Sequence, residues 1–150
     1  MTPELHPHEP EESPDYAELV AFFGHIAYII PGLRPVLADH LREADGEMLP
    51  HLLMTDVLEW VCRESERGMS AEAPVLFGAL DRGYTDGSHA MRDLMVIAFL
   101  EHIPGFAGTV PDPTGVGPKV RAAMGPLMSA VLAEIESWRH DPSTRPRPTR

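Results

Sequence analysis

Cysteine and long hydrophobic runs are scarce in this sequence of 150 residues. Its single cysteine, Cys62, excludes an intramolecular disulfide and a metal site built from thiolates. The longest apolar run, Leu94 to Leu100, is much shorter than the roughly 18 residues that a membrane span requires. The N-terminal stretch is rich in glutamate and proline and lacks the apolar core of a secretory signal. We therefore expect a cytoplasmic protein with no membrane span.

Basic residues are also few. The chain has 12 lysines and arginines against 23 aspartates and glutamates, which gives a formal net charge of -11. A surface of this sign repels the phosphates of nucleic acids and anionic lipid headgroups. We therefore expect neither nucleic acid nor a membrane as partner, and we expect a basic protein partner instead.

The rest of the composition is that of a globular domain, with 43% hydrophobic and 23% charged residues. Apolar residues recur at helical spacing, and no useful length of strand-like alternation is present. These patterns predict an all-α fold, either a single-domain helical bundle or stacked helical hairpins, with about six helices. We expect the helical domain to span residues 15–140, between a disordered acidic tail at 1–14 and a disordered basic tail at 141–150.

Capping residues and prolines indicate where the helices begin and end. Ser13 and Pro14 favour one helix start, and Ser70 or Asp86-Gly87-Ser88 are the next start signals. Residues 105–117 are typical of a surface loop, and a loop of this length is often functional or mobile. The expected helices cover residues 15–30, 33–44, 49–62, 75–80, 91–103 and 118–138, the last of them kinked at Gly125-Pro126.

The apolar segment from Met91 to Ile103 predicts a central helix that is buried on most sides. On a helical wheel at about 100° per residue, Val96 and Leu100 fall on the polar side of this helix. Either a neighbouring helix covers these two residues or they form an apolar patch for a partner, and covering is the commoner outcome. The predicted core side carries Met91, Leu94, Met95 and Ala98.

Glu101 and His102 extend this core side at the C-terminal end of the central helix. A histidine suits the negative end of the helix dipole, whereas a glutamate does not. In a structural interpretation, Glu101 hydrogen-bonds a loop or pairs with Arg82 or Arg121, and His102 contacts the carbonyls of the last turn. In a functional interpretation, both side chains belong to a binding site.

Asp56 is another polar residue in an apolar segment. If one helix continues from Leu49, Asp56 lies within its apolar stripe and needs a partner. If the helix restarts with Thr55 as its N-cap, Asp56 is an acid in a first turn and has a structural role. We favour the restart, because a Thr-Asp pair is a common helix start.

The sequence lacks a recognisable catalytic set. His51 and Asp56 are five residues apart and do not share a helix face, and no His-Glu-x-x-His motif is present. The segment from Gly115 to Lys119 has neither the spacing nor the preceding strand of a phosphate-binding loop. We therefore expect no enzymatic activity, no metal and no cofactor.

Three segments together resemble a family of small acidic all-helical bacterial proteins, known as a domain of unknown function. Some members of that family are similar to the immunity proteins of toxin systems. The resemblance implies that His51, Asp56, Glu101 and the Gly-Pro-x-x-Arg segment ending at Arg121 belong together, and it supplies no reaction. Members usually carry asparagine at the position of His102. The matching segments are Leu49 to Trp60, Arg92 to Pro104 and Gly117 to Arg121, within residues 47–124.

The function that we expect is a protein-interaction module, in its most specific form an immunity-type protein that neutralises a basic partner or toxin. The alternative is a small-ligand-binding or regulatory helical protein with a polar site around Asp56, Glu101 and His102. The candidate binding residues are His51, Asp56, Glu101, His102 and Arg121, and the candidate interface residues are Val96 and Leu100.

Overall fold

The computed structural model describes residues 13–68 and 70–140 of the chain. Within these ranges every regular element is helical, which confirms the predicted all-α fold. The predicted tails lie outside the described residues, except for Ser13 and Pro14, with which the first helix begins. The α-helices are α1 (Pro14–Ile29), α2 (Arg34–Glu43), α3 (Pro50–Glu66), α4 (Glu72–Asp86), α5 (His89–Asp93), α6 (Gly117–Ala123) and α7 (Pro126–His140).

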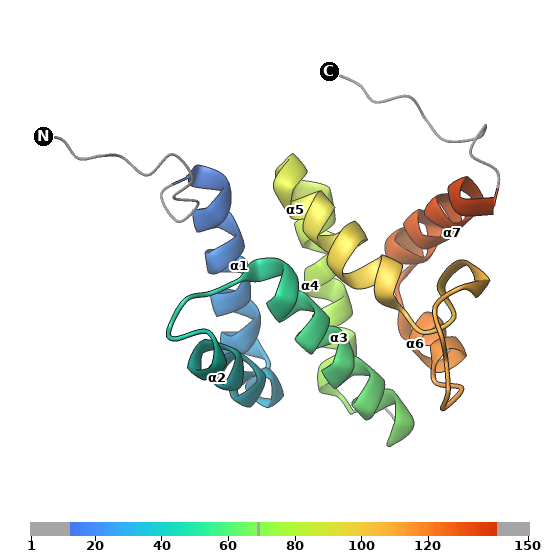
Figure 1. Ribbon diagram of the computed structural model, residues 1–150, viewed down its shortest axis with the longest axis horizontal. Coiled ribbons are helices and arrows are strands. Elements are labelled where there is room, and N and C mark those ends of the chain that lie inside the picture. Colours follow the sequence, from blue (N-terminus) through green and yellow to red (C-terminus); the bar gives the residue numbers. More distant parts are fainter. Residues whose placement is uncertain (1–12, 69, 141–150) are drawn as a thin grey trace, which may run out of the picture.

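The helices pack around one hydrophobic core (Figure 1). Helix α3 and the central helix that starts with α5 lie against each other, with α1 and α2 on one side and α6 and α7 on the other. Helix α4 runs behind them and contacts α1, α5, α6 and α7. No helix in the described part of the chain is both long and apolar enough to cross a membrane. The largest fully buried side chains include Phe23, Ile26, Leu53, Met54, Leu76, Leu80, Leu94 and Phe99.

Two helices begin with the serine caps that the sequence predicts. The Ser13 hydroxyl accepts a hydrogen bond of 2.9 Å from the backbone N–H of Tyr16, at the start of α1. The Ser88 hydroxyl caps α5 by accepting from Met91 N–H at 3.2 Å, and it donates to the carboxylate of Glu18. Because Glu18 belongs to α1, the second cap also joins α1 to the central helix.

The central helix is not a regular α-helix throughout. After α5, Leu94–Phe99 form a π-helical segment and Leu100–His102 form a short 3-10 segment. A π-helical turn holds an extra residue, so the residues after it rotate by about 100° from their α-helical positions. Met91, Leu94, Met95 and Ala98 are all buried, as the helical wheel predicts for the core side.

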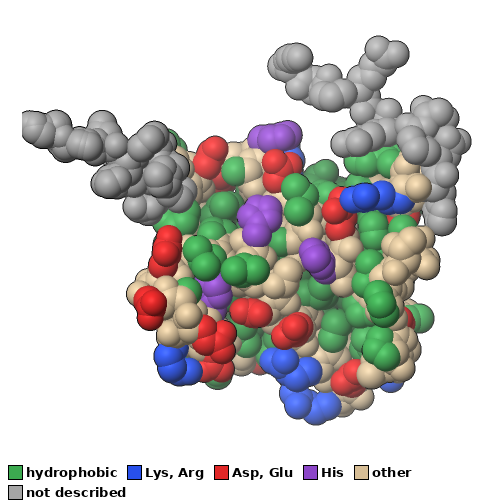
Figure 2. Space-filling model, viewed as in Figure 1, with side chains coloured by type: hydrophobic (Ala, Val, Ile, Leu, Met, Phe, Trp, Pro, Cys, Tyr) green, Lys and Arg blue, Asp and Glu red, His purple; other side chains and the backbone are tan. Residues whose placement is uncertain are grey.

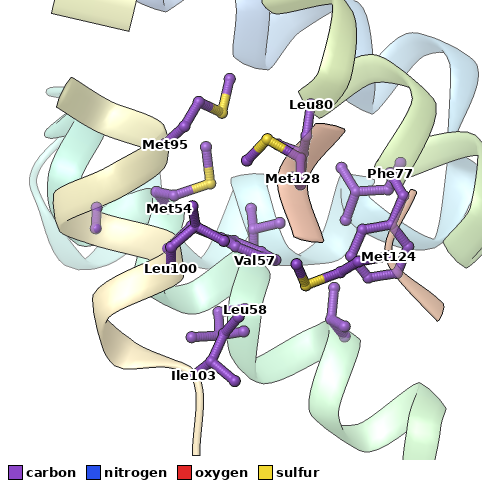
Figure 3. Packing of buried hydrophobic residues seen from close by; sticks show 14 of the residues in the cluster. Met54, Val57, Leu58, Phe77, Leu80, Met95, Leu100, Ile103, Met124 and Met128 are labelled. Carbon is purple, nitrogen blue, oxygen red and sulfur yellow. The ribbon is translucent and has the colours of Figure 1, made fainter. Parts of the chain in front are cut away.

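The rotation corrects the helical wheel for the second half of the central helix. Leu100 is completely buried and Val96 packs against the core, so these two residues form no exposed patch. Ile97 is exposed instead, with 46% of its surface accessible. His102 does not extend the core side, because it turns outward and Ile103 takes the buried position. Figure 3 shows Leu100 and Ile103 directed into the core, on the side of α3.

Helix α3 is continuous, so the favoured restart at Thr55 is wrong. The Thr55 hydroxyl donates to the carbonyl of Leu52 at 2.6 Å and caps no helix. Pro50 occupies the first turn, where its fixed φ favours helix and its missing N–H costs nothing. Burial of Leu53, Val57 and four other apolar side chains along the helix then stabilises it as one element.

The predicted last helix is two helices, because the chain breaks where only a kink was expected. Met124 ends α6 with an extended backbone (φ -74°, ψ 150°), and α7 begins at Pro126. Proline lacks the N–H that a continuous helix needs, and it disfavours helical backbone at the preceding Gly125. The break lets α6 and α7 leave at different directions (Figure 1).

The predicted loop at 105–117 is packed and hydrogen-bonded. Phe106 and Val116 are buried, each with 3% of its surface exposed. The Asp112 carboxylate accepts from the backbone N–H groups of Val116 and Gly117 at 2.9 and 3.0 Å. These bonds stabilise the start of α6, because N-terminal N–H groups lack partners within a helix.

Candidate functional site

The predicted binding residues lie in three different places. Asp56 faces α2, whereas Glu101 and Arg121 both pair with residues of α7. Figure 1 shows α2 and α7 on opposite sides of the molecule. His102 is exposed and lines a groove along the second half of α3. The structure therefore does not gather Asp56, Glu101 and His102 around one polar site.

Asp56 is paired with a buried histidine that sequence reasoning missed. Its carboxylate lies 3.6 Å from Nδ1 of His40, and the His40 side chain is 6% exposed. Nε2 of His40 accepts a 2.9 Å hydrogen bond from the backbone N–H of Leu49. Because Nε2 is an acceptor, the ring proton sits on Nδ1 and faces Asp56. The sequence did contain a signal for the burial of His40. His40 follows Leu33 by seven residues and Val36 by four, and this spacing places it on the apolar stripe of α2.

Further exposed carboxylates lie on the second half of α2 and in the loop between α2 and α3. Asp39 is paired with Arg42 at 2.6 Å, so the positive charge of Arg42 is already neutralised. Leu52 lies one turn before Asp56 on α3 and exposes 59% of its surface, although it is a large apolar side chain. Figure 2 shows acidic side chains gathered over this part of the molecule. We call this surface the acidic face, formed by the exposed Asp39, Glu43, Asp45, Glu47, His51 and Leu52 with the half-buried Asp56.

Glu101 and Arg121 are both bound to α7. Glu101 pairs with Nη2 of Arg139 at 3.0 Å, so the expected partners Arg82 and Arg121 are wrong. Arg121 makes two hydrogen bonds to Glu136, at 3.0 and 2.5 Å. These bonds raise the pKa of Arg121, against the opposing effect of partial burial. The two-pronged pair of Arg121 and Glu136 is geometrically specific and fixes α7 against α6. The pair of Glu101 and Arg139 joins α7 to the central helix.

The same α7 residues hold the loop at its start. Glu136 accepts a 2.7 Å hydrogen bond from the backbone N–H of Ala107, which has a left-handed φ of 53°. The guanidinium of Arg139 lies over the ring of Phe106, 6.0 Å from its centre. Sequence reasoning missed Glu136 and Arg139, because both lie on a regular helix with no local anomaly.

A shallow groove of about 320 Å³ runs along the second half of α3. Burial, together with the nearby carboxylates of Glu66, Asp112 and Glu59, raises the pKa of the Cys62 thiol in this groove to about 11. A thiol with this pKa is a weak nucleophile at neutral pH. The groove is lined by Leu58, Glu59, Cys62, Arg63, Glu66, His102 and Pro104.

The remaining cavity and the metal-ligating side chains offer little chemistry. An apolar crevice of about 10 Å³ between α1, α2 and α3 has room for about one water molecule. Among the described residues, no three side chains of His, Cys, Asp or Glu are placed to hold a metal ion.

Residues 23–139 match the family model described as Domain of unknown function (DUF7674). The chain belongs to this family. The matched range is longer than the segments that carry the resemblance in the sequence, and it includes all of α2 to α6. No curated protein and no solved structure matches the chain.

The DUF7674 domain thus offers two surfaces with unusual chemistry. One is the acidic face, which combines carboxylates with an exposed leucine. The other is the groove beside Cys62, which combines two exposed carboxylates with an apolar floor. Leu52, Glu59 and Glu66 follow one another at intervals of seven residues on α3, so the two surfaces adjoin along one side of that helix.

Proposed function

We propose that this domain is a protein-interaction module that binds a basic protein partner through the acidic face. The observation that carries the proposal is Leu52, which is 59% exposed beside the carboxylate of Asp56. An apolar side chain within a charged rim is the usual composition of a protein interface. The leucine would supply buried apolar area, and the carboxylates would supply specificity for a basic surface.

The backbone beneath the acidic face is held in place before any partner binds. His40 fixes the chain between α2 and α3 by accepting from Leu49 N–H, and its other nitrogen faces Asp56. The hydroxyl of Tyr16 on α1 also donates to the carbonyl of Met48 at 2.8 Å. A surface that is already ordered loses less conformational entropy on binding, which favours affinity.

The charge of the chain supports a basic partner. A net charge of -11 attracts a basic protein over a distance of about 8 to 10 Å at physiological salt and raises the association rate. In its most specific form, the proposal is that the partner is a basic toxin and that the domain neutralises it as an immunity-type protein. The acidic surface supports this form of the proposal, because a domain that covers the basic substrate-binding surface of a toxin would block the toxin.

Purification of the tagged full chain from its native cells at moderate salt tests the proposal. We expect one basic protein to be recovered with the wild type and to be lost with Leu52→Asp. The matched control is Val75→Asp on α4. Val75 is also an exposed apolar residue, with 43% of its surface accessible, but it lies outside the acidic face. The control should retain the partner. Equal recovery with both variants, or recovery of the chain alone, would refute the proposal.

A further inference from the structure

We infer that the groove beside Cys62 receives an arginine side chain of the partner, an inference that rests on the proposed function. The groove is open, and its two glutamates outnumber Arg63, the one arginine or lysine among its lining residues. Its apolar floor suits the stem of a long basic side chain.

The charges in the groove are arranged along α3. Glu59 and Glu66 are seven residues apart, so they lie on the same side of the helix and about 10 Å apart along its axis. Cys62 lies between them, and both carboxylates are near enough to act on its thiol. Within the described part of the chain, neither glutamate forms an ion pair or a hydrogen bond. A cation placed over Cys62 would therefore lie between two unpaired carboxylates.

The other lining residues favour arginine over lysine. Leu58 is 4% exposed and forms an apolar floor with Pro104, against which the methylene stem of arginine can pack. The planar guanidinium is more weakly hydrated than an ammonium group and can stack on the ring of His102. Arg63 is the one cation among the lining residues, and it leaves the two carboxylates in excess. The volume of about 320 Å³ is at the lower end of ligand sites, which fits one side chain.

The groove continues the acidic face along α3. Glu59 lies three residues after Asp56, which is less than one helical turn. Leu52 and Cys62 are about 15 Å apart along the helix axis, a span that one partner covers in an interface of ordinary size. A second copy of this chain is a poor occupant, because two molecules of net charge -11 repel each other.

An NMR titration of the isotope-labelled full chain tests the inference. The probe is the blocked peptide acetyl-Gly-Arg-Gly-amide, and its control replaces arginine with citrulline, which has nearly the same shape without the charge. We expect the arginine peptide to shift the amide signals of residues 59–66 and of His102 in a saturable way. The citrulline peptide should not. Shifts of equal size with both peptides, or shifts confined to other residues, would overturn the inference.

Two double variants separate recognition in the groove from bulk charge. Glu59→Gln with Glu66→Gln should weaken binding of the arginine peptide at least fivefold. Asp86→Asn with Glu134→Gln makes the same change in net charge outside both the groove and the acidic face and should alter affinity by less than twofold. Equal weakening by both pairs would show general electrostatic attraction and would overturn the inference. All four residues are exposed, so the variants should fold, and circular dichroism checks this.

The two proposals fail in different ways. Leu52→Asp should leave binding of the arginine peptide unchanged, because Leu52 does not line the groove. If the partner depends on Leu52 but the peptide does not bind, the groove inference is refuted and the proposed function stands. If the peptide binds in the groove but no basic partner depends on Leu52, arginine recognition is upheld and the acidic face is refuted as the docking surface.

Discussion

The π-helical segment of the central helix makes a prediction for Leu100 that differs from that of a regular α-helix. An uninterrupted α-helix would place Leu100 on the polar side, whereas the structure buries Leu100 completely and exposes Ile97. We therefore compare Leu100→Ala with Ile97→Ala. Both substitutions remove aliphatic carbon from the same helix, so the pair isolates the effect of burial.

The expected magnitudes follow from the two exposures. Leu100 has no accessible surface, so its truncation leaves a cavity in the core and should cost about 3 kcal/mol of unfolding free energy. Ile97 already exposes 46% of its surface, and alanine has the higher helix propensity, so its truncation should cost under about 1 kcal/mol. For a chain of this size the difference corresponds to about 4 to 8 °C in melting temperature.

Urea unfolding followed by circular dichroism measures both variants against the wild type. The comparison uses the midpoint and requires that the slope with denaturant stay unchanged, because an altered slope would indicate a different unfolded or folded state. If Ile97→Ala destabilises the protein as much as Leu100→Ala, the central helix does not rotate at the π-helical segment and the assigned burial is wrong.

The remaining predictions concern a close backbone approach and the thiol. Gly117→Ala should cost at least about 2 kcal/mol in urea unfolding, because its new methyl group would overlap the backbone carbonyl of Pro104, whereas Gly24→Ala in the open middle of α1 should stabilise by about 0.5 to 1 kcal/mol. Equal effects would refute the close approach. At pH 8 Cys62 should react with a thiol reagent about 100-fold more slowly in the native protein than in urea, because the native thiol has a pKa of about 11 against an ordinary value of 9.0. The native rate should rise about tenfold per pH unit up to pH 10, and a fast native reaction at pH 8 would contradict the assigned burial.

Local chemistry made the helix starts predictable. Ser13 and Ser88 cap α1 and α5 as expected, because a serine cap depends on the backbone of its own first turn. The helix at Pro50 was placed less well, since proline at the first position and Thr55 as a cap are both acceptable local starts. Burial of the apolar side chains along α3 decided between them, and burial is a property of the whole fold.

The sequence did not predict in the same way which side of the central helix faces the core after Phe99. Seven consecutive apolar residues, Leu94 to Leu100, present an apolar side chain in every direction, so the sequence contains no marker for an extra residue in one turn. The packing of this segment against α3 selects the rotation that buries Leu100 and Ile103 and turns His102 outward. The error for His102 therefore came from assuming 100° per residue beyond Phe99.

Glu101 and Arg121 were candidate binding residues from the sequence but lie in neither of the two proposed surfaces, and the reason is physical. Glu101 was conspicuous because a charge on a core side needs a partner, and Arg121 was named as one possible partner. Each of the two instead pairs with a residue of α7. Their partners Glu136 and Arg139 are less than one turn apart, so both ion pairs anchor α7. Leu52 was inconspicuous because it lies beside Leu53 in an apolar stretch, and only the fold distinguishes the exposed leucine from the buried one. A single exposed leucine is ordinary on a protein surface, so the proposal for Leu52 depends on the carboxylates around it, because an apolar side chain within a charged rim has the composition of an interface.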